Sequence, residues 1–131
     1  MRILVVEDEC LLAMNLESML GDLGHLVVGS AGNRQEALSA ADDADLAFVN
    51  VRLSDGATGP EIAEELRAAH GVTVVFTTGS PEMVSDDGAE VVNKPYDEEM
   101  IASAVDHAAA AHRRKLRAES LAEIRGPAAA I

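Results

Sequence analysis

Five short apolar runs divide the chain into segments of roughly twenty residues, and this repeat limits the fold more than any other feature. The runs are residues 3–6, 26–28, 46–49, 72–76 and 89–92. Such continuous apolar runs are typical of strands buried on both faces of a parallel sheet. Helix-forming segments lie between most of them, and right-handed crossovers place helices on both faces. The sequence therefore predicts an α/β fold with a doubly wound, five-stranded parallel sheet.

Local signals indicate where the helices begin and end. Asp8 is in position to cap a helix after the first strand, and Gly24 to end that helix. Asn33 starts a capping-box pattern for a second helix, and Pro60 suits the first turn of a third. The segment 80–88 contains proline and glycine, so at most a turn or two of helix fits there. We expect a shortened fourth helix and a mobile loop at this point.

An alanine-rich last helix is predicted to start near Asp97 and to continue past His112 until Gly126 and Pro127 stop it. This pattern divides the chain into a domain of residues 1–112 and a C-terminal helical tail of residues 113–131.

The tail also differs in charge from the rest of the chain. The whole chain has a net charge of −13, whereas residues 113–131 have five basic and two acidic side chains. The cations suit the carboxyl end of a helix, although they could equally contact an acidic partner or a second subunit. Leu116, Leu121 and Ile124 predict a possible homodimer seam along this helix.

The composition excludes several classes of partner. A strongly acidic chain does not favour general binding to nucleic acid or to an anionic membrane, and no apolar run is long enough to span a membrane. The single cysteine, Cys10, cannot form an intramolecular disulfide, and we expect it to be a small packing residue. With no signal-peptide pattern at the N-terminus, these features predict a cytoplasmic protein.

Polar residues follow four of the predicted strands. Glu7 and Asp8 follow the first strand, Asn50 the third, Thr78 the fourth and Lys94 the fifth. The carboxyl ends of strands meet at one edge of a doubly wound sheet, where ligands bind. An acidic pair with a third oxygen ligand suits Mg²⁺. A hydroxyl and an ammonium group opposite could hold the oxygens of a phosphoryl group.

Together these residues resemble the receiver domain of two-component response regulators over residues 1–112. The matching segments are Val5-Val6-Glu7-Asp8-Glu9, Asp45-Leu46-Ala47-Phe48-Val49-Asn50 with Gly56 downstream, Thr78-Gly79, and Lys94-Pro95-Tyr96. The resemblance implies a flavodoxin-like (βα)5 fold that takes phosphate from a sensor histidine kinase or a phosphotransfer protein. It also implies a cis bond between Lys94 and Pro95.

The resemblance assigns a role to each candidate residue. Glu7 and Asp8 would bind Mg²⁺ together with residue 50 and the backbone carbonyl of Arg52. Thr78 would be the switch hydroxyl, and Lys94 the lysine that contacts the phosphoryl group. The run Phe76-Thr77-Thr78-Gly79 also resembles the Phe-Ala-Thr-Gly motif of an α-proteobacterial subgroup of single-domain receivers. Links to general stress response signalling are common in that subgroup.

Two residues depart from the receiver pattern. Asn50 stands at the phosphoacceptor position, where a carboxylate nucleophile is required. We therefore expect no phosphorylation at residue 50 and a weakened Mg²⁺ site. Both a natural pseudo-receiver and a deliberate Asp-to-Asn substitution would explain this residue. Val91 replaces the aromatic switch of receivers, so any switch would act through Thr78 and the following loop.

Three functions follow as hypotheses. The first is a single-domain response regulator of a phosphorelay, here in a non-phosphorylatable form. The alternative is a pseudo-receiver that binds proteins independently of phosphorylation, through the first helix or the output face, with a kinase or an anti-anti-sigma-like protein as partner. An enzyme is disfavoured, because residue 52 is Arg rather than a second carboxylate and no glycine-rich nucleotide loop follows the first strand.

Overall fold

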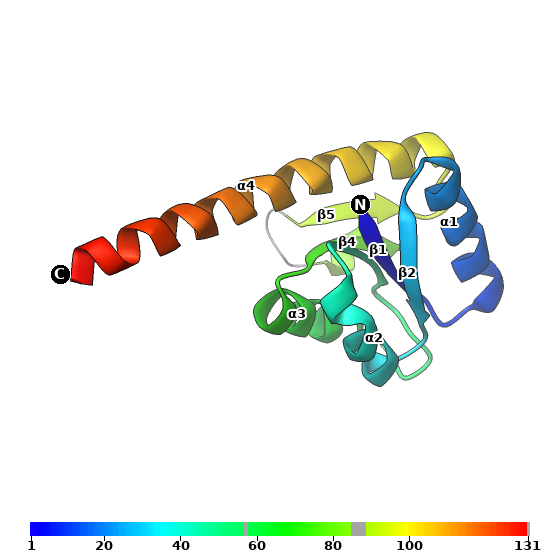
Figure 1. Cartoon of the computed structure of the whole chain (residues 1–131). Helices are drawn as coiled ribbons and strands as arrows, with labels where there is room; N and C mark the ends of the chain where they lie inside the picture. The colour runs from blue at the N-terminus through cyan, green and yellow to red at the C-terminus, as the bar shows by residue number, and fades with distance from the viewer. Residues whose placement is uncertain (57, 85–88, 131) are drawn as a thin grey trace.

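A single parallel sheet forms the centre of the computed structural model, which describes residues 1–56, 58–84 and 89–130. Its strands lie in the order β2-β1-β3-β4-β5 (Figure 1). They are β1 (Arg2–Val6), β2 (Leu26–Ala31), β3 (Leu46–Asn50), β4 (Thr73–Thr78) and β5 (Glu90–Asn93). This topology confirms the predicted doubly wound, flavodoxin-like sheet.

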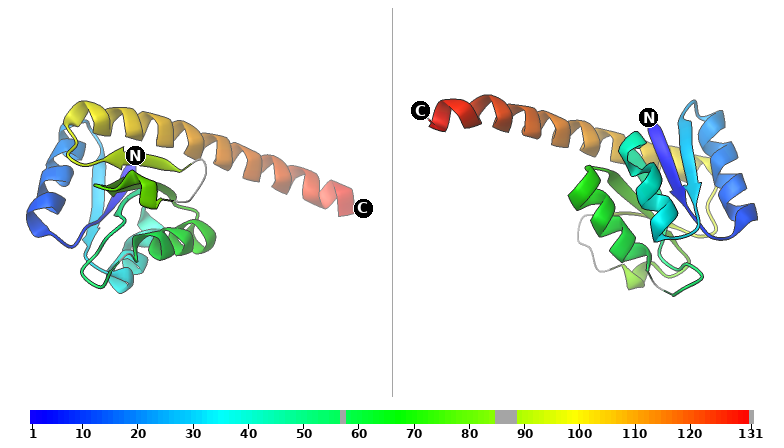
Figure 2. Two further views of the ribbon diagram at one scale, coloured as in Figure 1. Left: turned by 180° about the vertical axis from the view of Figure 1, so that it is seen from behind. Right: turned by 60° about the horizontal axis from the view of Figure 1, so that its bottom comes forward.

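In the described residues, four α-helices cover the two faces of the sheet (Figure 2). Helices α1 and α4 pack on one face, and α2 and α3 on the other. The helices are α1 (Cys10–Asp22), α2 (Arg34–Ala40), α3 (Gly59–His70) and α4 (Glu98–Ala130). Among the described residues, none of these helices has both the length and the apolar character needed to cross a membrane.

The core has two layers because successive strand residues point to opposite faces. Every residue of β3 is buried, as expected for a central strand. The chain has two phenylalanines, and each layer contains one: Phe48 faces α1 and α4, and Phe76 faces α2 and α3. Complete burial of one such side chain contributes about 2–3 kcal/mol. The aliphatic layers therefore hold the carboxyl ends of the strands at fixed positions.

The capping box of α2 is confirmed. The Asn33 side chain accepts a hydrogen bond from the Glu36 backbone N–H at 2.9 Å. The Glu36 carboxylate in turn accepts from the Gly32 N–H and the Asn33 side chain, both at 3.1 Å. These contacts satisfy donors that the first turn of a helix leaves unpaired.

Two predictions about α1 were wrong. Asp8 does not cap the helix, because the N-cap position is occupied by Glu9, which makes no side-chain capping bond. Asp8 instead lies one residue earlier, at the end of the sheet. Cys10 is exposed rather than packed in the core. The first residue of α1 faces solvent, and the Cys10 Sγ lies 4.0 Å from the Met14 Sδ.

The last helix is longer than predicted. Asp97 precedes it and accepts a hydrogen bond from the Met100 N–H at 2.9 Å, as expected at a helix start. However, α4 continues through residues 126 and 127 to Ala130, so they do not end it. A proline removes one backbone hydrogen bond and weakens a helix without making it impossible. The distal part of α4 extends away from the sheet (Figure 1).

The connection from β4 to β5 has no α-helix in its described part. It contains a 3-10 helix, Pro81–Met83, in agreement with the predicted shortening. The mobility expected for the loop 80–88 stays a prediction, and residues 85–88 of that loop lie outside the described residues. The bond between Lys94 and Pro95 is cis, as predicted.

Candidate functional site

The structure brings the predicted site residues together at the carboxyl ends of the strands. Glu7 and Asp8 follow β1, Asn50 is the last residue of β3, and Thr78 is the last residue of β4. Lys94 directly follows β5 and donates from its backbone N–H to the Thr78 carbonyl at 2.8 Å. The parallel pairing of β1, β3, β4 and β5 thus aligns four separate segments at one edge.

The Glu7 carboxylate is the central acceptor of this site. The Asn50 Nδ2 donates to the Glu7 Oε2 at 3.0 Å, and the Lys94 Nζ donates to the Glu7 Oε1 at 3.0 Å. The backbone N–H of Glu9 also donates to the Oε2, at 3.3 Å. Glu7 is buried, with 7 % of its surface exposed. A buried carboxylate requires such partners, and here an ammonium supplies the compensating charge.

Beside this network lies a cavity of about 320 Å³. Its lining includes Asp8, Asn50, Arg52, Thr78 and Lys94. Polar groups from the carboxyl ends of four strands and from the loop after β3 therefore face one partly open cavity. Its volume suits a small polar ligand.

Thr78 has a local partner in this structure. Its Oγ1 accepts a hydrogen bond from the Ser80 backbone N–H at 3.0 Å. The hydroxyl is thereby held at the start of the loop that follows β4. It lines the cavity in an orientation set by the loop.

Backbone contacts hold the described residues on either side of position 57, between β3 and α3. Leu53 and Gly56 exchange hydrogen bonds at 2.8 and 3.0 Å, and Gly56 has a φ of 115°, a conformation that favours glycine. Gly59 packs against the backbone of Asn50 and Val51 so closely that a Cβ atom would overlap the Asn50 carbonyl oxygen. The sequence reasoning missed Gly59, because no local pattern distinguishes a packing glycine from a turn glycine.

Glu9 and Ser80 also line the cavity, and the sequence reasoning did not assign either to it. Glu9 directly follows Asp8, and Ser80 follows Gly79, the residue after Thr78. This closeness in sequence to predicted site residues was the signal that could have identified them. Nearby, Tyr96 is half-buried, and its burial together with the charge of Glu7 raises the pKa of the phenol above its ordinary value of 10.0.

The lining of the cavity includes residues with oxygen groups of the kind that Mg²⁺ prefers. No group of three or more His, Cys, Asp or Glu side chains suited to a metal occurs in the described ranges. Glu7 already binds Asn50 and Lys94, which leaves Asp8 as the carboxylate that lines the cavity. Mg²⁺ commonly binds through one or two carboxylates and retains several waters. Asp8, the Asn50 amide oxygen and the Arg52 carbonyl are therefore a chemically suitable donor set with reduced charge.

The chain is similar to known proteins over most of its length. Residues 3–106 match the family model of the response regulator receiver domain. The phyllosphere-induced regulator PhyR of Methylorubrum extorquens is 32% identical over 113 residues, which are 81% of this chain and 42% of that protein. The chain thus spans about two fifths of the length of this curated relative.

Solved structures give the same result. The receiver domain of PhyR from Erythrobacter litoralis superposes with a TM-score of 0.73 at 30% identity, over 82% of this chain and 88% of that one. The anti-anti-sigma factor PhyR of Bartonella quintana superposes with a TM-score of 0.80 at 27% identity, over 90% of this chain and 51% of that one. Since the matching family model spans most of the sequence, this chain belongs to the response regulator receiver domain family.

Proposed function

We propose that this chain is a signalling receiver of a phosphorelay, in a form that cannot be phosphorylated. The observation that carries the proposal is the position of Asn50. A neutral amide ends the central strand at the edge of the cavity and donates to Glu7. It stands where phosphoryl transfer would need an ionised carboxylate.

The chemistry of such a transfer explains the role of each residue. A carboxylate oxygen at residue 50 would attack phosphorus while the bond to the donor's leaving group breaks. The Lys94 ammonium and the Thr78 hydroxyl would hold the phosphoryl oxygens. Mg²⁺, when bound by Asp8, residue 50 and the Arg52 carbonyl, would supply charge neutralisation. The amide of Asn50 is uncharged and a poor nucleophile, so the transfer does not start.

The contacts of Asn50 also favour one state of the site. Lys94 and Asn50 both donate to Glu7, which forms a closed polar network without any ligand. Thr78 simultaneously accepts from Ser80. We infer that this arrangement corresponds to the unphosphorylated state and that Asn50 stabilises it.

A surface beside the site supports binding of a protein partner. Leu11 and Met14 on α1 are 81 % and 57 % exposed. A neighbouring cavity of about 320 Å³ is mainly apolar, and its lining includes Leu12, Pro95 and Tyr96. Exposed apolar patches of this kind mark interaction sites. We propose that a sensor histidine kinase or phosphotransfer protein docks here, next to residue 50.

We propose different roles for the receiver and for the C-terminal extension. Residues 1–112 form the receiver, and residues 113–131 are a C-terminal extension. Its described part belongs to α4 and is available for a homodimer contact through Leu116, Leu121 and Ile124, which are exposed. A cytoplasmic location agrees with the single cysteine.

The proposal is tested by restoring the carboxylate. Asn50→Asp, incubated with a small phosphodonor and Mg²⁺, should gain the mass of one phosphoryl group, which hydroxylamine removes. The parent chain should gain none. Asn15→Asp, the same change at an exposed position on α1, is the matched control and should also gain none. Absence of phosphate on Asn50→Asp would refute the receiver chemistry.

A pseudo-receiver that binds proteins without phosphorylation is the second candidate, favoured by the preformed network around Glu7. The two candidates differ in one measurement. If phosphorylation of Asn50→Asp changes its affinity for a purified kinase or phosphotransfer domain, position 50 is a switch. If the affinities of the parent, Asn50→Asp and phosphorylated forms agree, binding is independent of phosphorylation.

A further inference from the structure

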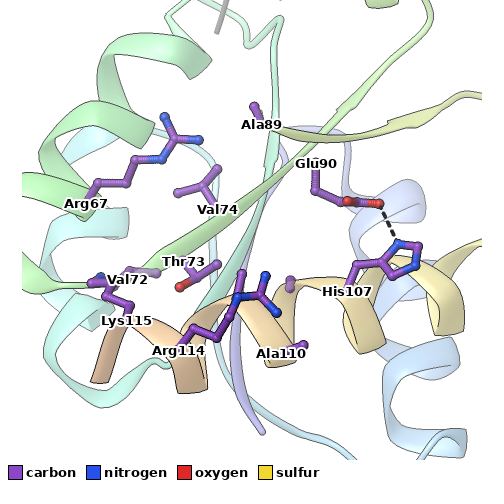
Figure 3. A pocket seen from close by; sticks show the side chains of 12 residues that line it. Arg67, Val72, Thr73, Val74, Ala89, Glu90, His107, Ala110, Arg114 and Lys115 are labelled. Carbon is purple, nitrogen blue, oxygen red and sulfur yellow. Dashed lines mark hydrogen bonds and ion pairs between the residues drawn. The ribbon is translucent and has the colours of Figure 1, made fainter. Parts of the chain in front are cut away.

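A groove of about 610 Å³ lies between α3 and α4 (Figure 3). It is formed at the amino ends of β4 and β5, whereas Asn50 lies at the carboxyl end of β3. Its floor contains small or branched apolar side chains, including those of Val72, Val74, Ala89 and Ala111. Among the residues that the structure describes, none lines both this groove and the cavity beside Asn50. The groove is therefore a separate feature of the fold.

The topology explains why space exists at this point. Parallel strands are joined by crossovers that usually contain a helix, and these helices cover the faces of the sheet. In the described part of the β4–β5 connection, the 3-10 helix Pro81–Met83 replaces such a helix. Ala89 and Val91, at the edge of the sheet, are consequently only partly buried. The pairing of β4 with β5 begins at Val75 and Glu90, and the groove opens beside Thr73 and Val74, before that point.

The charge of the groove is opposite to that of the chain. The chain has a net charge of −13, yet Arg67 of α3 and Arg114 and Lys115 of α4 border the groove (Figure 3). Glu90 is the carboxylate among the described lining residues, and it pairs with His107 at 3.4 Å. Cationic side chains thus outnumber anionic ones here.

Two of these cations are held in place by neighbouring groups. The Lys115 Nζ donates to the Gly71 carbonyl at 2.6 Å, and the Arg67 guanidinium lies 5.5 Å from the centre of the Phe76 ring. Side chains that are already ordered lose little further freedom when a ligand binds. The rim is therefore arranged in advance for an anionic partner.

We propose that this groove binds an acidic amphipathic helix of a partner protein. The apolar side chains of that helix pack over Val74 and Ala111, and its carboxylates approach Arg114 and Lys115. An amphipathic helix suits this site because such helices lay their apolar face into an apolar groove, and an acidic one fits because the rim is cationic. The inference goes beyond the proposed phosphorelay role and does not depend on residue 50.

The test uses the full chain and a defined probe. The probe is a fluorescein-labelled helical peptide with Leu on one face and Glu on the flanking positions, and its counterpart has Lys in place of Glu. Fluorescence anisotropy should show saturable binding of the Glu peptide only. Arg114→Glu should weaken that binding at least about tenfold. Arg113→Glu, the same charge change at the adjacent exposed residue, should change it less than about twofold.

A second variant tests whether binding depends on the shape of the groove and not only on its charge. Ala111→Phe fills the floor without changing any charge, and it should abolish binding while the circular dichroism spectrum stays that of the parent. Amide chemical-shift changes on titration should centre on Val74, Ala89 and Ala111. The proposal is overturned if the Lys peptide binds equally well, if Arg113→Glu and Arg114→Glu have equal effects, or if the shifts centre on α1. Displacement of the peptide by a single-stranded oligonucleotide would also overturn it, because it would indicate a general polyanion site.

Discussion

Replacing Asn50 by aspartate should turn a stabilising contact into a repulsive one. In the parent chain, the Asn50 amide donates to the Glu7 Oε2 at 3.0 Å. In Asn50→Asp, a carboxylate oxygen takes the place of that donor and faces a carboxylate that is already buried. We predict that the variant is less stable than the parent when Mg²⁺ is absent.

The magnitude follows from the geometry. Two carboxylate charges about 4 Å apart repel by about 4 kcal/mol at an effective dielectric constant of about 20. Protonating one carboxyl group at neutral pH to avoid the repulsion costs a similar amount, since about three pKa units correspond to about 4 kcal/mol. The Lys94 ammonium, 3.0 Å from Glu7, offsets part of this. The expected loss in free energy of unfolding is about 2–3 kcal/mol.

Mg²⁺ should recover much of the loss, because it binds the folded state of the variant. With a dissociation constant of about 1 mM, about 10 mM Mg²⁺ would stabilise Asn50→Asp by about 1.4 kcal/mol. The parent, with one carboxylate fewer in its donor set, should gain less than about 0.3 kcal/mol. Urea unfolding followed by circular dichroism, in EDTA and in MgCl₂, measures both quantities.

The control for this prediction is Asn15→Asp, which adds the same charge at an exposed position on α1. Its free energy of unfolding should stay within about 0.5 kcal/mol of the parent value in either buffer. If Asn50→Asp unfolds at the same urea concentration as the parent in EDTA, the contact with Glu7 does not have the energetic role assigned to it. Equal Mg²⁺ responses of parent and variant would contradict the assigned donor set.

Three further predictions concern the scaffold. Gly59→Ala should lower stability by about 2–3 kcal/mol, because the new Cβ overlaps the Asn50 carbonyl oxygen. The matched change Gly21→Ala, which meets nothing within 4 Å in α1, should be neutral or stabilising by up to about 1 kcal/mol; equal losses in the two variants would contradict the packing argument. Asn33→Ala should cost about 1 kcal/mol through loss of the α2 cap, measured by urea unfolding. Burial lowers the pKa of His112 below its ordinary value of 6.5, so the unfolded chain takes up a proton first as the pH falls through 6.5. The neutral His112 therefore contributes stability above pH 6.5, and this contribution is lost as the pH falls from 6.5 toward the lower pKa of the folded state. The melting temperature of the parent should fall relative to that of His112→Gln between about pH 7.5 and 5.5.

Much of the fold was predictable because strand and helix patterns are local. Apolar runs such as residues 46–49 indicate buried strands, and the capping box at Asn33 marks a helix start within four residues. The helix-ending signal at residues 126–127 was misleading, since α4 continues to Ala130. The cap assigned to Asp8 was also wrong, because a carboxylate beside a strand end has more than one available partner.

By itself, the sequence determined the order of strands and helices and the type of residue that ends each strand. It thereby determined that an amide, rather than a carboxylate, ends β3. The tertiary structure alone decided which groups share the Glu7 carboxylate, since Asn50 and Lys94 are 43 and 87 residues away from it along the chain. It also decided that a groove with a cationic rim opens between α3 and α4. Periodicity is a property of neighbouring residues, whereas contacts between distant residues depend on how the layers pack.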